Sequence, residues 1–219
     1  MILEDALQNE LFMRNLDIYD FEACYEALAE TERYKLAQFL LEESLDPLKD
    51  LDYIPDLLFS HLDFSYFNIP DRIKTIGRNA FSQCKELEQL SIPSNVTRIE
   101  KFAFADCLNL SDIDFNDSLE LIDVGAFMSC ENLKVIMLPS RLKLISPQCF
   151  MESGVEELFL PNSLEEISAN AFSGCKKLNK IYYKGTMEDW KKVKKGISSF
   201  RDVPTRLVRC SDGTMRLRG

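Results

Sequence analysis

Apolar residues recur through the middle of this chain with a period of 22 or 23 positions, far longer than the period of a helix or a strand. The anchor of each period is a phenylalanine that follows a small residue, as in "NAF", "FAF" and "GAF". The anchors are Phe81, Phe104, Phe127, Phe150 and Phe172. Periods of about 20 to 29 residues are typical of solenoids, so the pattern predicts five stacked coils.

Each period also carries a short apolar segment after the anchor, written L-x-x-L-x-I in residues 87–92. Alternation of this kind predicts one short strand in each coil. We expect the strands of successive coils to form a parallel β-sheet on the concave face of the solenoid. A single coil cannot bury its own apolar side, so each coil must be covered by its neighbours.

Cysteine occupies a fixed slot three positions after the anchor in four of the five periods, and the fourth period, which lacks it, is one residue short. The thiols in this slot are Cys84, Cys107, Cys130 and Cys175. We interpret phenylalanine and cysteine as two interior columns with side chains about 4.8 Å apart. Cysteine then serves as a small apolar group that needs no hydrogen bond.

The wording of the repeat, IP-(S/N)-x-(V/L)-x-x-I-x-x-x-A-F-x-x-C-x-x-L-x-x-(L/I), resembles the BspA-like class of leucine-rich repeats over about residues 62–183. The tail segments "IYYKGTMEDWKKV" and "LVRCSDGT" resemble the C-terminal cap of that family. The resemblance implies a cap with a helix at 187–193, a closing strand at 207–210 and Trp190 covering the end of the core. It also implies a binding protein, since known members are mostly surface proteins associated with attachment to other proteins.

Residues 1–60 show no copy of the repeat. Apolar residues such as Phe21, Tyr25 and Leu28 have helical spacing instead, which predicts two to four short amphipathic helices. The expected fold class is therefore an α+β repeat protein with three parts. These are an acidic α-helical head at 1–60, a leucine-rich repeat solenoid at 61–183 and a C-terminal cap at 184–219.

Charge is spread unevenly along the chain, whose formal net charge is −10. The first 70 residues hold 16 acids and 4 bases, whereas the last 36 hold 4 acids and 10 bases. The acidic head disfavours direct binding of nucleic acid and favours a basic partner or a nucleic-acid-binding protein. The candidate head residues are Glu22, Glu26, Glu30, Glu42 and Glu43. No apolar run suits a membrane span, and the N-terminus does not read as a signal peptide, so we expect a cytoplasmic protein.

Chemistry-bearing motifs are sparse. The seven cysteines include no C-x-x-C pair and the only histidine is His61, which argues against a tetrahedral metal site. No glycine-rich phosphate loop occurs. We therefore expect no catalytic residue, no cofactor and no bound metal.

The outward positions of the predicted strands are the best binding candidates, because side chains on a strand alternate between its two faces. One outward column is mixed in character, and the other becomes apolar and aromatic over its last three coils. An exposed apolar column suits protein docking, although residues that merely favour strands, or that the head or cap covers, would give the same pattern. The candidates are Tyr66, Gln89, Asp112, Asp114, Val135, Met137, Glu157, Phe159, Lys180 and Tyr182.

Three functions remain open from these observations. The first is a scaffold or adaptor that binds a protein through the strands, the head or both. The second is a phage- or mobile-element-encoded inhibitor that blocks a nucleic-acid-handling or defence enzyme through its acidic surface. The third is a fragment of a cell-surface adhesin. The sequence pattern leaves the oligomeric state open.

Overall fold

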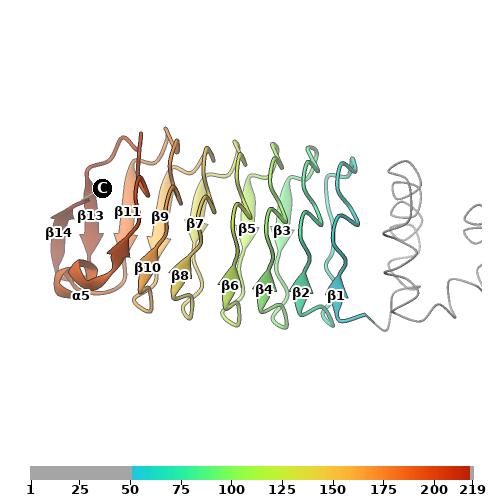
Figure 1. The fold of residues 1–219 in the computed structure, drawn as a ribbon, viewed down its shortest axis with the longest axis horizontal. Coiled ribbons are helices and arrows are strands. Elements are labelled where there is room, and N and C mark those ends of the chain that lie inside the picture. Colours follow the sequence, from blue (N-terminus) through green and yellow to red (C-terminus); the bar gives the residue numbers. More distant parts are fainter. Residues whose placement is uncertain (1–50, 218–219) are drawn as a thin grey trace, which may run out of the picture.

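The computed structural model describes residues 51–217, which wind into a β-solenoid whose coils follow one another along the long axis (Figure 1). The core of the solenoid is a column of stacked phenylalanine rings with centroids 5.1–5.5 Å apart. The column contains the five predicted anchors and two further rings, Phe59 and Phe200, one at each end. The solenoid therefore has seven coils rather than the five predicted.

The first coil was predicted only as a half-repeat, at Phe64, Phe67 and Ile69, because the sequence around its ring departs from the repeat. Its ring, Phe59, stacks on Phe81 at 5.1 Å, but Leu58 and Leu62 stand where other coils carry alanine and cysteine. Residues 51–60, assigned to the head by the sequence pattern, thus belong to the solenoid. The helices predicted for the rest of the head lie outside the described residues.

Two strands, not one, form in each regular coil, so the prediction of a single strand was incomplete. The first set follows the L-x-x-L-x-I segment and comprises β3 (Gln89–Ser91), β5 (Asp112–Asp114), β7 (Val135–Met137), β9 (Glu157–Leu160) and β11 (Lys180–Tyr183). The second set, called here the second ladder, comprises β1 (Tyr53–Ile54), β2 (Thr75–Ile76), β4 (Arg98–Ile99), β6 (Leu121–Ile122), β8 (Leu144–Ile145), β10 (Glu166–Ile167) and β12 (Lys194–Lys195). Neighbouring strands of both sets pair in parallel, except between β5 and β7 and between β6 and β8.

Each buried thiol of the cysteine column makes a hydrogen bond, which corrects the interpretation that it needs none. The Cys84 Sγ donates to the carbonyl oxygen of Phe59 at 3.0 Å, in the preceding coil. In the same way, Cys107 donates to the carbonyl oxygen of Phe81, Cys130 to that of Phe104 and Cys175 to that of Phe150. Burial raises the pKa of Cys84 and Cys130 to about 12, so these thiols stay protonated and unreactive at neutral pH.

Every coil turns at two residues with left-handed backbone, two positions before and two positions after the stacked phenylalanine. Their φ angles lie between 53° and 77°. Most of these residues are not glycine, although a left-handed conformation costs other residues energy. Gly125 is needed for a second reason, because a Cβ there would lie 2.3 Å from the Phe102 ring. His61 is one of these turn residues in the first coil.

Both ladders are interrupted between the same two coils, at a place called here the seam. β5 does not pair with β7, and β6 does not pair with β8. Regular coils are joined by bonds such as Ser111 N to Glu88 O at 2.9 Å, and the equivalent bond from Lys134 to Ser111 is absent within residues 51–217. At the seam Phe115 occupies the position that is Ile92 one coil earlier, and its ring meets Phe127 edge-on at 5.5 Å. The predicted continuous sheet is thus two shorter sheets joined at the turns.

The C-terminal cap contains the expected helix, α5 (Met187–Lys192), which begins at a capping box formed by Thr186 and Asp189. Trp190 is buried and packs on Tyr183 with ring centroids 5.2 Å apart. The predicted closing strand is β13 (Leu207–Cys210), and an unpredicted strand, β14 (Gly213–Arg216), pairs with it in antiparallel fashion. Parallel pairing of β11 with β13 carries the first strand set into the cap.

The lysines at positions 191, 192, 194 and 195 of the cap do not all lie on the helix. The helix ends at Lys192, and β12 extends the second ladder through Lys194 and Lys195. The Lys195 Nζ donates to the carbonyl oxygen of Trp190 at 2.5 Å and lies 4.2 Å from the centre of its ring. These interactions fix the end of the helix against the last coil.

Candidate protein-binding face

The outward side chains of the first strand set form two parallel rows, and the surface they make is called here the strand face. Strand register aligns Gln89 with Asp112, and Val135 with Glu157 and Lys180, in the first row. The second row holds Ser91, Asp114, Met137, Phe159 and Tyr182 in the same order. Tyr66 precedes the first row through a bridge to Gln89. The structure therefore places all ten predicted strand residues on one face, with the seam between the strands of Asp114 and Met137.

Beyond the seam the strand face is largely apolar. Met137 is 61% exposed and Val135 is 43% exposed. Phe159 and Tyr182 stack with ring centroids 4.6 Å apart, so the two rings form one aromatic cluster on this face. A stacked aromatic pair beside an exposed methionine is a typical composition for the centre of a protein interface.

The cap extends both rows, which sequence reasoning missed. Register with β11 and β14 places Arg209 next to Tyr182 in the second row, and its guanidinium lies 5.5 Å from the centre of the Tyr182 ring. Leu207, 50% exposed, and Arg216 continue the first row. The alternation of "LVRC" in the predicted closing strand contained this signal, since Leu207 and Arg209 are its two outward positions.

Charge changes sign from one end of the strand face to the other. Asp112 and Asp114 are exposed before the seam, and Arg209 and Arg216 are exposed on the cap. Between them, Lys180 and Glu157 form an ion pair with Nζ and Oε1 2.5 Å apart, and the hydrogen bond to Glu157 raises the pKa of Lys180. The apolar surface therefore lies between an acidic end and a basic end.

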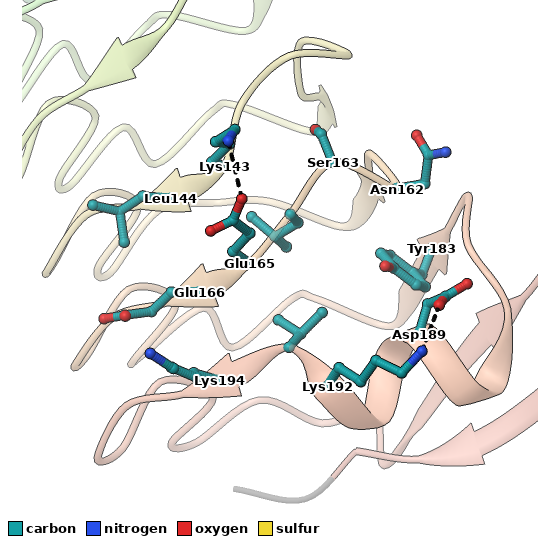
Figure 2. A pocket seen from close by; sticks show the side chains of 12 residues that line it. Lys143, Leu144, Asn162, Ser163, Glu165, Glu166, Tyr183, Asp189, Lys192 and Lys194 are labelled. Atoms are coloured by element: carbon teal, nitrogen blue, oxygen red, sulfur yellow. Dashed lines mark hydrogen bonds and ion pairs between the residues drawn. The ribbon is translucent and has the colours of Figure 1, made fainter.

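A cavity of about 560 Å³ beside the cap is an alternative binding site to the strand face (Figure 2). Its wall carries charged side chains, but Lys143 is paired with Glu165 at 3.1 Å and Lys192 with Asp189 at 3.3 Å. Figure 2 shows these pairs on opposite sides of the cavity. Charges that are already paired in this way favour a structural role for the cavity wall.

The remaining predicted features are less informative. The head candidates Glu22, Glu26, Glu30, Glu42 and Glu43 lie outside the described residues. Within residues 51–217, no group of three or more His, Cys, Asp or Glu side chains is arranged to hold a metal ion. In the same part of the chain, no helix has the length and apolar character that crossing a bilayer requires.

Comparison with known proteins gives a consistent result for the fold. Residues 52–181 match the family described as "BspA type Leucine rich repeat region", in six copies. A leucine rich cell surface protein from Faecalibacterium prausnitzii is similar at 30% identity with a TM-score of 0.59. That match covers 60% of this chain and 35% of the other, so the chain spans about a third of that protein's length.

A second solved structure, the T. pallidum Leucine Rich Repeat protein, is similar in fold, with a TM-score of 0.61 at 22% identity. The match covers 70% of this chain and 72% of that protein. A comparison with curated proteins finds no match. The family match includes the first coil, which the repeat pattern had placed partly in the head.

Proposed function

Because the chain belongs to the BspA-type leucine-rich repeat family, we propose that it is a protein-interaction module that binds its partner through the strand face. Solenoids of stacked repeats present extended surfaces and use them for binding rather than for catalysis. The observation that carries the proposal is the apolar patch beyond the seam, where Met137 is 61% exposed beside the stacked rings of Phe159 and Tyr182.

The patch has no structural reason to be apolar. The side chains that hold the coils together point inward, and Ile136 and Leu158 between the outward residues are fully buried. Polar residues at the outward positions are compatible with the same strand, since Gln89, Ser91 and Asp112 occupy them before the seam. Exposed apolar surface that the fold does not require is the usual mark of a docking site.

Replacing both Met137 and Phe159 with Asp is expected to abolish partner binding and to leave the solenoid folded. Two charges buried at the centre of an interface weaken the free energy of binding by at least about 2 kcal/mol, which corresponds to a loss of affinity of about thirtyfold. The measurement is quantitative capture of proteins from the native host with the immobilised chain, followed by mass spectrometry, together with circular dichroism and thermal unfolding of each variant.

The control is Leu144→Asp, which introduces one negative charge of the same kind at a position 37% exposed on the second ladder. This control is expected to capture the same proteins as the wild type. If the Met137/Phe159 variant captures every protein that the wild type does, at the same level, the strand face is not the binding site.

A second candidate function, a cell-surface binding protein, is favoured by the likeness to the Faecalibacterium cell surface protein at 30% identity. A cell-surface protein would bind through the same strand face as a cytoplasmic scaffold, and the two functions differ only in the location of the protein and its partner. Fractionation of native cells distinguishes them. The proposal of an inhibitor that acts through an acidic surface depends on residues 1–50, and no described contact supports it.

A further inference from the structure

We propose that the strand face is self-complementary and binds a second copy of the chain in a two-fold symmetric dimer. This inference rests on the proposed function, in that it takes the strand face to be a recognition surface, and it goes on to name one occupant. The observations that carry it are the opposite charges at the two ends of the face and their positions two strands to either side of β9.

The charged ends lack partners of their own within the described residues. Asp112 and Asp114 are exposed on β5 and form no ion pair within residues 51–217. Arg209 is exposed on β13, and within the same residues its guanidinium lies over the ring of Tyr182 and forms no ion pair with a carboxylate. Free charges of opposite sign at the ends of one apolar surface fit a partner with the reverse polarity.

The strand order makes a second copy such a partner. Counted along the face, β5, β7, β9, β11 and β13 follow one another, so β9 is the middle strand. A two-fold axis that runs parallel to the strands, in the plane between the two faces and directly opposite β9, exchanges β5 with β13 and β7 with β11. Two strand faces packed by this operation therefore place the acidic end of each copy on the basic end of the other, and an interface of this kind closes at two subunits.

The same operation matches the side chains of the second row. Asp114 faces Arg209 of the second copy, and Met137 faces Tyr182 of the second copy. Phe159 meets its own equivalent at the axis. In the first row, the operation places Glu157 opposite its own equivalent and Lys180 opposite Val135 of the second copy, and each Glu157 carboxylate keeps its ion pair with Lys180 of its own chain. The second row is thus apolar at its centre and carries an ion pair at each end.

The expected affinity is modest because the face is narrow. Five strands at about 4.8 Å span about 24 Å, and a face of this width buries less than the about 800 Å² per partner of a standard stable interface. A dissociation constant on the order of 10 to 100 µM is expected for such a contact. A different protein with a larger complementary surface would displace the second copy.

Charge reversal tests the pairing directly. In Asp114→Arg, and separately in Arg209→Asp, both ion pairs of the dimer become repulsive, and each variant alone is expected to dimerise at least about tenfold more weakly. An equimolar mixture of the two variants restores both pairs, because each reversed charge then meets the other, so a heterodimer of near wild-type affinity is expected. Sedimentation velocity over a concentration series and native mass spectrometry, which separates the two masses, measure both effects.

The control variant is Arg98→Asp, a charge reversal on the second ladder at an exposed position, and it is expected to dimerise as the wild type does. Thermal unfolding checks that every variant is folded. A wild-type chain that remains monomeric at the highest concentration, or a mixture that associates no better than its components, overturns the inference. Either result leaves the proposed function intact if the Met137/Phe159 variant still loses partner capture, so the two failures are distinguishable.

Discussion

Raising the pH from about 8 to about 10 is expected to unfold this protein or bring it close to unfolding, because the core contains five buried thiols. Burial raises the pKa of Cys84 and Cys130 from 9.0 to about 12 and that of Cys175 to about 11, and it raises the pKa of Cys107 and Cys149 as well. In the unfolded chain the same thiols lose their protons from about pH 9. Between these values the folded state binds more protons than the unfolded state.

The sign of the effect follows from this difference. The stabilising contribution of each thiol is fully present below pH 9 and is lost as the pH rises toward the folded-state value. In that range each thiol lowers the free energy of unfolding by about 1.4 kcal/mol per pH unit. Five thiols therefore lower it by about 7 kcal/mol by pH 10, which is comparable with the total stability of an ordinary domain. Burial likewise raises the pKa of Tyr183, whereas it lowers that of Lys195 to about 8, an effect that acts in the opposite direction.

Urea unfolding followed by circular dichroism at a series of pH values measures this loss. The midpoint is expected to be flat from about pH 7 to pH 8 and to fall steeply above pH 9. Cys130→Ala lowers stability at neutral pH but leaves one thiol fewer to titrate, so its midpoint falls less steeply with pH. A midpoint that does not change between pH 8 and pH 10 would contradict the assignment of buried, protonated thiols.

Replacing Phe127 with Ala is the single core substitution with the largest expected cost. Its ring lies between those of Phe104 and Phe150, with centroids 5.3 and 5.5 Å away, and Phe115 meets it edge-on. Loss of a fully buried phenylalanine costs about 3 to 5 kcal/mol. The loss falls in the middle of the solenoid, beside the seam, where both ladders are interrupted and the two coils are joined by the stacked rings and the hydrogen bonds of the turns.

The measurement is the free energy of unfolding from urea denaturation at neutral pH. Met137→Ala is the matched control in the following coil segment, because Met137 is 61% exposed and its loss is expected to change stability by less than about 0.5 kcal/mol. A cost below about 1 kcal/mol for Phe127→Ala would show that the phenylalanine column does not hold the coils together.

The repeat pattern predicted the interior well because interior positions obey strict physical requirements. A stacked ring such as Phe104 and a thiol such as Cys107 leave room for few substitutes, so the same letters return in each coil. The outward residues of the strands followed from alternation alone, once the inward ones were known. Residues that the core dictates are therefore the ones that a sequence reveals.

The end coils and the seam escaped prediction for physical reasons. Phe59 and Phe200 continue the column, but the terminal coils carry Leu62 and Val203 in the cysteine slot, and α5 lies between Phe172 and Phe200. The second ladder escaped because its strands are two residues long, too short for any alternation to be read. The seam depends on how neighbouring coils fit together, which a pattern within one coil does not express.

Photo-cross-linking from single positions tests most directly whether recognition occurs on the strand face. A photoreactive phenylalanine analogue replaces Met137 on the strand face in one chain and Arg98 on the second ladder in another, and both are irradiated in extract of the native host. The predicted result is a covalent adduct with a protein, either a second copy or another chain, from position 137 and none from position 98. Adducts from position 98 alone would contradict the account.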